Sequence, residues 1–112
     1  MSPRSHSVLI RRQAPVFAAL GDETRLVLVA KLCAGQARSI SKLTEGSRLT
    51  RQAVTKHLRV LQHAGIVHSE RAGRENLFEL DPTPLGEVRK YLDFVSRQWD
   101  LALARLKALV EE

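Results

Sequence analysis

The sequence is poor in cysteine and has no long apolar runs. Cys33 is the only cysteine among 112 residues, so no disulfide can form within the chain, and a disulfide-stapled secreted scaffold is excluded. A single thiol favours a reducing compartment, and we expect a cytoplasmic protein. No apolar run approaches the roughly 20 residues of a transmembrane helix, because basic residues interrupt the N-terminal stretches at Arg11, Arg12, Arg25 and Lys31. We therefore expect no membrane association.

The composition is otherwise that of an ordinary globular domain. Hydrophobic residues make up 44% of the chain and charged residues 27%, which excludes a wholly disordered or collagen-like protein. A chain of 112 residues can bury one hydrophobic core. We expect a mobile N-terminal arm over residues 1–12 and a single domain over residues 13–112.

Acidic residues are absent from the first 21 positions, and the net charge of +6 is spread unevenly along the chain. Residues 48–74 carry six bases and one acid, whereas residues 75–112 carry five bases and eight acids. Positive charge in the middle of a chain suggests a polyanionic partner, but a charge run is more often a solvated face. The charge therefore needs a structural context before it indicates nucleic acid.

Two helices are expected in the N-terminal third. Gln13–Leu20 is a short apolar segment. Asp22 can cap a second helix over residues 23–34. The apolar residues of this second segment cover most of its circumference, which predicts burial on several sides. Cys33 lies in it, and a small core residue is the favoured interpretation over a redox or metal role.

A short third helix and a longer fourth follow. Ser39 can cap the third helix, which ends near Glu45, and Thr50 can cap the fourth, which runs to Ala64 before Gly65.

The fourth helix has two different faces. At 100° per residue, Val54, Leu58 and Leu61 fall within an arc of about 60°, which predicts an apolar stripe directed at the core. An arc of about 140° on the other side is polar and contains no acid. We call it the basic arc, and its members are Arg51, Gln52, Thr55, Lys56 and Arg59.

A β-hairpin and a long helix complete the chain. Residues 66–71 and 75–80 alternate apolar and polar side chains around Gly73, which predicts a hairpin over about residues 66–80. A helix over about residues 85–111 follows, and its apolar residues recur at alternating intervals of three and four, as in a heptad seam. This seam consists of Leu85, Val88, Leu92, Val95, Trp99, Ala102, Leu106 and Leu109. A helix of that length exceeds the needs of one small domain, so part of the seam should meet a second copy of the chain.

The order of elements predicts a mainly α fold with a small β-hairpin, arranged as a winged helix-turn-helix with a long C-terminal dimerisation helix. In this fold the basic helix can enter a DNA major groove, and the hairpin, or wing, reaches the flanking backbone.

Two segments of the chain resemble a known family. The recognition helix and wing of the ArsR family of bacterial repressors resemble residues 49–80, which read LTRQAVTKHLRVLQHAGIVHSERAGRENLFEL. The opening of that family's second helix resembles residues 20–26, which read LGDETRL. The resemblance covers most of residues 13–80 and implies a dimeric regulator, usually a repressor, that binds double-stranded DNA. The two-fold symmetry of such a dimer predicts an operator that is an inverted repeat.

Site residues follow from the helical faces, the wing and the seam. Base contacts are expected from the first turns of the basic helix, at Arg51, Gln52 and Thr55. Contacts to the DNA backbone are expected at Arg48, Lys56, His57, Arg59, Arg71 and Arg74. The dimer interface is expected to contain Val16, Phe17, Leu92, Val95, Trp99, Ala102 and Leu106.

The metal ligands typical of many ArsR members are missing. The family's cysteine pair before the recognition helix has no counterpart, because residues 39–45 contain neither Cys nor His. The family's Asp and His ligands on the last helix have only a partial counterpart in Asp93 and Asp100, since that helix lacks histidine. Borderline and soft metals need thiolate or imidazole ligands. We expect no metal site, no cofactor and the non-metal-sensing subgroup, and the existence of a small-molecule inducer stays open.

Three other function classes are alternatives to DNA binding. An enzyme is disfavoured, because no sequence pattern places a nucleophilic Ser or Cys against a catalytic base and no Gly-rich phosphate loop precedes a helix. RNA binding is disfavoured by an aromatic content of 4%, since single-stranded RNA modules stack bases on aromatic rings. A purely partner-binding dimer with a solvated basic face stays open, and salt-resistant, sequence-dependent DNA binding would exclude it.

Overall fold

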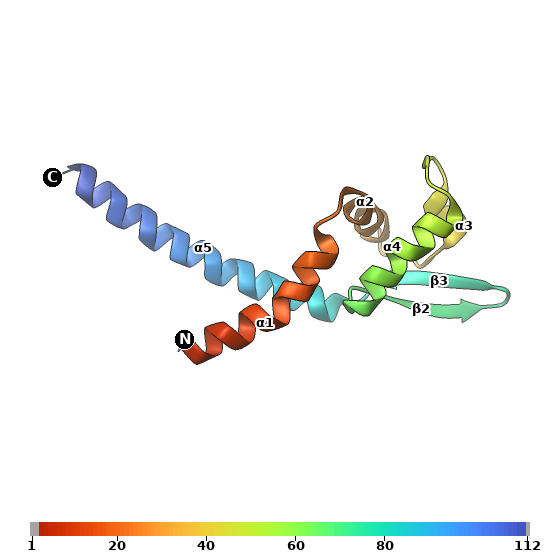
Figure 1. Ribbon diagram of the computed structural model, residues 1–112, viewed down its shortest axis with the longest axis horizontal. Coiled ribbons are helices and arrows are strands. Elements are labelled where there is room, and N and C mark those ends of the chain that lie inside the picture. Colours follow the sequence, from red (N-terminus) through yellow and green to blue (C-terminus); the bar gives the residue numbers. More distant parts are fainter. Residues whose placement is uncertain (1–2, 112) are drawn as a thin grey trace.

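The computed structural model describes residues 3–111 and contains five helices and a small sheet within that range (Figure 1). The elements are α1 (Pro3–Leu20), α2 (Glu23–Leu32), β1 (Arg38–Ser39), α3 (Ile40–Thr44), α4 (Arg51–His63), β2 (Val67–Ala72), β3 (Glu75–Leu80) and α5 (Pro82–Glu111). The order confirms the mainly α fold with a winged helix-turn-helix arrangement. Within residues 3–111, no helix is both long and apolar enough to cross a bilayer.

Helix α1 is longer than the sequence predicts. It begins at Pro3, so residues 3–12 form helical turns where we expected a mobile arm, and residues 1–2 of that arm lie outside the described residues. The helix passes through Pro15, which has no N–H to donate to the carbonyl of Arg11 and therefore bends the axis. Figure 1 shows α1 changing direction midway. The predicted helix began too late, at Gln13, because the segment before it has no apolar face that this chain alone could bury.

Helix α2 is buried on one side, which corrects the prediction of burial on several sides. Leu28 and Leu32 are in the core, whereas Leu26 is 52% exposed and Val27 48% exposed. Cys33, expected in the core, is exposed at the end of the helix. The molecule measures only 29 and 21 Å across its shorter axes, about two helix diameters, so a helix in this body keeps an outer face in solvent.

The caps predicted for the middle helices are confirmed. The side chains of Asp22, Ser39 and Thr50 each accept a hydrogen bond from the backbone N–H three residues later, which satisfies a donor at the start of the helix. After α4, Gly65 has a φ of +78°, a left-handed conformation that glycine adopts without strain. The helices therefore begin where the capping residues predicted.

The hairpin is confirmed, with a third strand beside it. β2 pairs antiparallel with β3 in the register Ala72↔Glu75, leaving Gly73 and Arg74 as a two-residue turn in which Gly73 has a φ of +64°. β1 pairs with the other edge of β3. A two-residue strand carries no periodicity, so the sequence did not predict it.

One core joins the helices to the sheet. Its central residues, all at most 2% exposed, come from α2, α3, α4, β2 and the connection between α4 and β2. These residues are Leu32, Leu43, Val54, Leu58, Leu61, Ile66 and Val67. Phe78 of β3 and Val88 of α5 complete the same cluster. The stripe predicted on α4 is therefore confirmed as its buried face.

Helix α5 makes the molecule elongated. The radius of gyration is 18.3 Å, compared with about 13 Å for a compact chain of this length. The helix has 30 residues, a length of about 45 Å, and Figure 1 shows its C-terminal half projecting from the body without a neighbour in the described chain.

Candidate nucleic-acid interface

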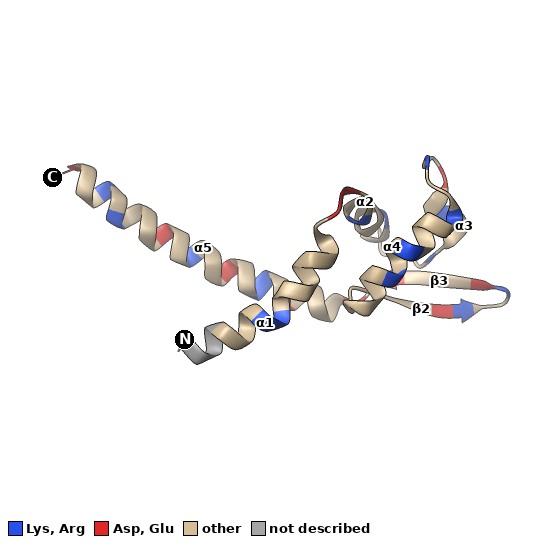
Figure 2. Ribbon diagram, in the orientation of Figure 1, with Lys and Arg blue, Asp and Glu red and all other residues tan. Residues whose placement is uncertain are grey.

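The basic arc of α4 lies on the surface, opposite the buried stripe. Arg51, Gln52, Lys56 and Arg59 are exposed, and Thr55 is half-buried. Together with Ile40 of α3 they line one open concave surface. Figure 2 shows the basic residues of α4 on the ribbon beside those of α3. The fold therefore brings all five predicted arc residues onto a single surface.

The hydroxyl of Thr55 already has one partner. It donates to the carbonyl oxygen of Arg51 at 2.7 Å, one turn earlier in the helix. Its oxygen keeps acceptor capacity and its methyl group can make apolar contacts. Thr55 can therefore contact a base edge as an acceptor or through its methyl group.

The wing places further cations near the start of α4. Arg71 lies near the end of β2, and Arg74 occupies the turn; both are exposed. Arg74 and Arg51 line the same hollow between the turn, the start of α3 and the start of α4. Acidic Glu75 also lines this hollow. Arg48 is exposed on the loop before α4, so it extends the cationic surface at the same end of the helix.

His57 is placed differently from the other predicted contacts. Its Nδ1 lies 3.2 Å from Nη1 of Arg25 and 3.8 Å from Oδ2 of Asp22, both near the start of α2. The side chain is 25% exposed. Its assignment as a DNA backbone contact stays a prediction, and one of its two nitrogens is already occupied within the chain.

Asp22 is the anion of this small group. The pKa of its carboxyl lies below the usual value because the side chain accepts the backbone N–H of Arg25, and smaller electrostatic interactions with Arg25 and His57 act in the same direction. Partial desolvation opposes these effects without cancelling them. The carboxylate is therefore held in its charged form at the start of α2, where the helix dipole also favours an anion.

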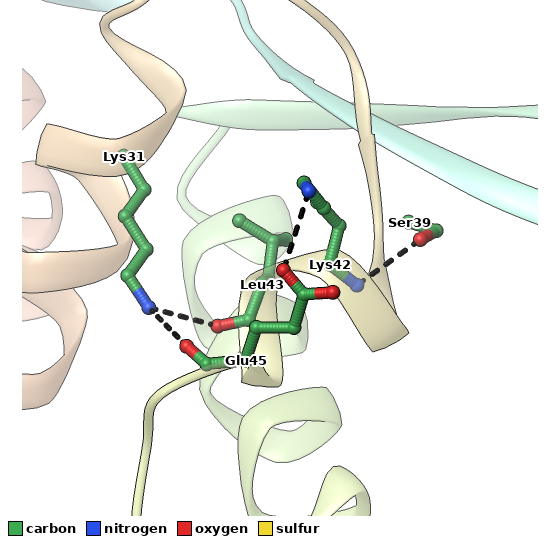
Figure 3. A network of polar contacts seen from close by, with 5 residues as sticks. All are labelled: Lys31, Ser39, Lys42, Leu43 and Glu45. Atoms are coloured by element: carbon green, nitrogen blue, oxygen red, sulfur yellow. Dashed lines mark hydrogen bonds and ion pairs between the residues drawn. The ribbon is translucent and has the colours of Figure 1, made fainter.

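Lys31 is a structural residue that sequence analysis missed. Its Nζ donates to the carbonyl oxygens of Leu43 at 3.1 Å and Glu45 at 3.5 Å, at the end of α3 (Figure 3). Glu45 also pairs with Lys42 across one turn, at 3.3 Å. A cation at the C-terminal carbonyls of a helix satisfies groups that have no partner within the helix. Lys31 thereby fixes α3 against α2. No sequence pattern predicts a contact between residues twelve positions apart.

The surface shared by α1 and α5 is partly used within the chain. Gln13 is buried and donates from Nε2 to Oε2 of Glu87 at 3.2 Å, and the rings of Phe17 and Tyr91 meet edge to face. Val16, predicted at a dimer interface, is only 6% exposed and belongs to the chain's own core. Its place in the dimer interface stays a prediction.

The remaining interface candidates lie on the surface in varying degrees. Phe17 is 37% exposed, Leu92 49%, Trp99 64% and Leu106 58%. Ala102 is exposed and Val95 half-buried. The first turns of the seam pack on the body, whereas the later turns have an open apolar face. The described chain therefore does not bury its whole seam by itself.

No three side chains from His, Cys, Asp and Glu converge as a candidate metal site anywhere in the described range. Metal independence stays a prediction, which a binding measurement would test.

Comparison with known proteins identifies relatives over most of the chain. A family described as a helix-turn-helix domain matches residues 20–70. The HTH-type transcriptional regulator Rv2034 of Mycobacterium tuberculosis is 36% identical over 95 residues, covering 85% of each chain.

Solved structures agree with this result. An ArsR-like transcriptional regulator from Rhodococcus sp. RHA1 is 35% identical, with a TM-score of 0.73 over 88% of this chain and 92% of that one. A homodimeric winged helix-turn-helix DNA-binding domain from Mycobacterium bovis shares the fold at 19% identity, with a TM-score of 0.66 over 88% and 89% of the two chains. These relatives are regulators rather than enzymes. With its winged fold, its basic helix and relatives at this level of identity, the chain belongs to the ArsR family of helix-turn-helix transcriptional regulators.

Proposed function

We propose that the protein is a sequence-specific, dimeric DNA-binding repressor that recognises an inverted repeat through α4 and the wing. The observation that carries the proposal is the basic arc, a continuous cationic surface on a helix whose other face is locked in the core. A helix held in this way can present its side chains to the major groove as a rigid unit.

The proposed contacts divide into two classes. Arg51, Gln52 and Thr55 read bases, because Arg can bind guanine and Gln adenine through paired hydrogen bonds. Six further residues bind phosphates, which position the protein without reading sequence. This second class consists of Arg48, Lys56, His57, Arg59, Arg71 and Arg74.

The proposed dimer rests on the open apolar face of α5 and on Phe17 of α1. An apolar surface of that extent is uncommon on monomeric proteins, and the Mycobacterium bovis domain of the same fold is a homodimer. A two-fold axis would relate the two α4 helices, so the two half-sites should lie about 34 Å apart, one turn of DNA.

Selection from a pool of random duplexes tests the proposal. The protein should enrich duplexes with a two-fold related motif, and binding to the enriched duplex should exceed binding to a scrambled duplex by at least about a thousandfold near physiological salt. Equal affinity for enriched and scrambled duplexes would contradict sequence-specific recognition. A basic face that binds neither would instead support the partner-binding alternative.

A further inference from the structure

Arg25 of α2 connects its own helix to the end of α1 and to the recognition helix α4. Its backbone N–H donates to Oδ2 of Asp22 at 3.0 Å, and its side-chain Nε donates to the carbonyl oxygen of Ala19 near the end of α1. Its Nη1 reaches Nδ1 of His57 on α4 at 3.2 Å. The side chain is half-buried between these elements. A guanidinium can make both side-chain contacts at once because its donors are fixed in a plane, which the single ammonium group of lysine cannot imitate.

The contact with His57 defines the state of the imidazole. The guanidinium only donates, so Nδ1 must accept, and the proton of the neutral ring then lies on Nε2. Nδ1 also lies 3.8 Å from Oδ2 of Asp22. Arg25 therefore selects one tautomer of His57 while anchoring the ring.

His57 is well placed to control the rotation of α4. At 100° per residue it lies about 160° around the helix from Arg59, so it is on the far side from the middle of the basic arc. The apolar stripe formed by Val54, Leu58 and Leu61 holds α4 against the core and limits its rotation coarsely, because the hydrophobic effect itself has no preferred direction. The hydrogen bond from Arg25 is directional, and it is made to one defined atom of α4.

We propose that Arg25 is a positioning residue for DNA recognition: through Nδ1 of His57 it fixes the rotation of α4 about its own axis and so aligns the basic arc with the bases. A rotation of about 15° would displace a group 5 to 6 Å from the helix axis by about 1.5 Å. Productive recognition geometry tolerates about 0.5 Å. The inference rests on the proposed DNA-binding function and adds to it a residue outside the DNA-facing surface.

The test compares sequence preference rather than binding alone. The probes are the duplex enriched by the wild-type protein and a scrambled duplex of the same length and composition. The variants are Arg25→Met, Arg25→Lys, His57→Leu and the double variant Arg25→Met with His57→Leu. The measured quantity is the ratio of the two affinities, determined well below the unfolding temperature of every variant. A lost phosphate contact weakens both affinities and leaves this ratio unchanged.

Arg25→Met and His57→Leu should each lower the ratio at least tenfold, and the double variant should lower it no further than either single one. Arg25→Lys should lower it as well, because its ammonium cannot bridge Ala19 and His57. His57→Asn, which keeps an acceptor oxygen close to the position of Nδ1, should recover most of the ratio. The control is Val29→Ala, which removes half-buried packing from the same helix and should reduce stability without changing the ratio.

Three results would overturn the inference while leaving the proposed function intact. One is an affinity ratio in the Arg25→Met variant that equals the ratio of the wild type. Another is additivity of Arg25→Met and His57→Leu, which would show that the two residues act separately. The third is an equal loss of preference in Val29→Ala, which would assign the effect to stability. A wild-type protein with no preference for any duplex would overturn the proposed function and this inference together.

Discussion

The first prediction concerns the side chains of the basic arc. Replacing Arg51 or Gln52 by alanine should weaken binding to the enriched duplex by about 1 to 3 kcal/mol and relax the preference at one base pair of each half-site. Both side chains are exposed on the first turn of α4, so their removal leaves the core intact. Competition binding against duplexes with single substitutions would measure the effect. A uniform loss across all duplexes would reassign these residues to the DNA backbone.

Lys56 and Arg74 should behave differently, because point charges at phosphates carry no sequence information. Lys56→Ala and Arg74→Ala should weaken enriched and scrambled duplexes alike. Each substitution should also reduce the slope of log affinity against log salt by about 0.9. Titrations at several salt concentrations provide the measurement. An altered base preference with an unchanged salt slope would contradict the assignment.

Residue positions within one helix were predictable from the sequence, and contacts between helices were not. The 3.6-residue period was enough to separate Val54 and Leu58 from the basic arc. The partners of His57 and Lys31 depend on how α2 packs against α4 and α3, which no local period encodes. The burial of Val16 in the chain's own core likewise depends on how α1 packs on the body.

At the scale of the element, the cap of α2 predicts a pH dependence of stability. The hydrogen bond from the Arg25 N–H holds the pKa of Asp22 below its usual value. The unfolded chain therefore binds more protons at this residue in the window just below about pH 4, so stability rises with pH there. The contribution is complete above the unfolded pKa and is lost as the pH falls through the lower folded pKa.

The matched variant is Asp22→Asn, whose side-chain oxygen still caps the helix but does not titrate. The difference in melting temperature between wild type and Asp22→Asn should be fully present at about pH 5 and should shrink below about pH 4. Thermal melts across this range provide the measurement. A difference that stays constant down to pH 2.5 would exclude the carboxylate as its source.

The starts of α3 and α4 and the turn of the wing were predicted well, whereas the start of α5 and the strand β1 were not. Ser39 and Thr50 fixed the starts of α3 and α4, and Gly73 fixed the turn of the wing. The start of α5 moved from about residue 85 to Pro82, where proline suits the first turn and Asp81 accepts the N–H of Thr83. The two residues of β1 form a strand only because the edge of β3 lies beside them.

At the scale of the whole molecule, the open face of α5 predicts that binding requires a dimer. Leu92→Glu or Trp99→Glu should abolish tight binding to the inverted repeat without touching a DNA-facing group, because a buried unpaired carboxylate opposes association. The control is Ala104→Glu, an exposed position about 140° around the helix from Trp99. Sedimentation should find wild type and Ala104→Glu dimeric and the other two variants monomeric. A wild-type monomer at micromolar concentration that still binds the inverted repeat tightly would refute the interface.

The regulatory prediction is metal independence. Because residues 39–45 and the last helix lack the thiolate and imidazole ligands that soft metals require, affinity for the enriched duplex should be the same with zinc, cadmium, arsenite or chelator. Binding isotherms under the four conditions provide the comparison. A tenfold loss with micromolar metal, about 1.4 kcal/mol of coupling, would reveal a site made by the assembled protein.

The exposed thiol of Cys33 makes the chain suitable for distance spectroscopy without mutation. It is the only cysteine in the sequence, and it caps α2 rather than lying on a loose loop. A nitroxide attached there gives one label per protomer on the helix that carries Arg25. In a dimer, the separation of the two labels would therefore report how the two α2 helices move when operator DNA binds.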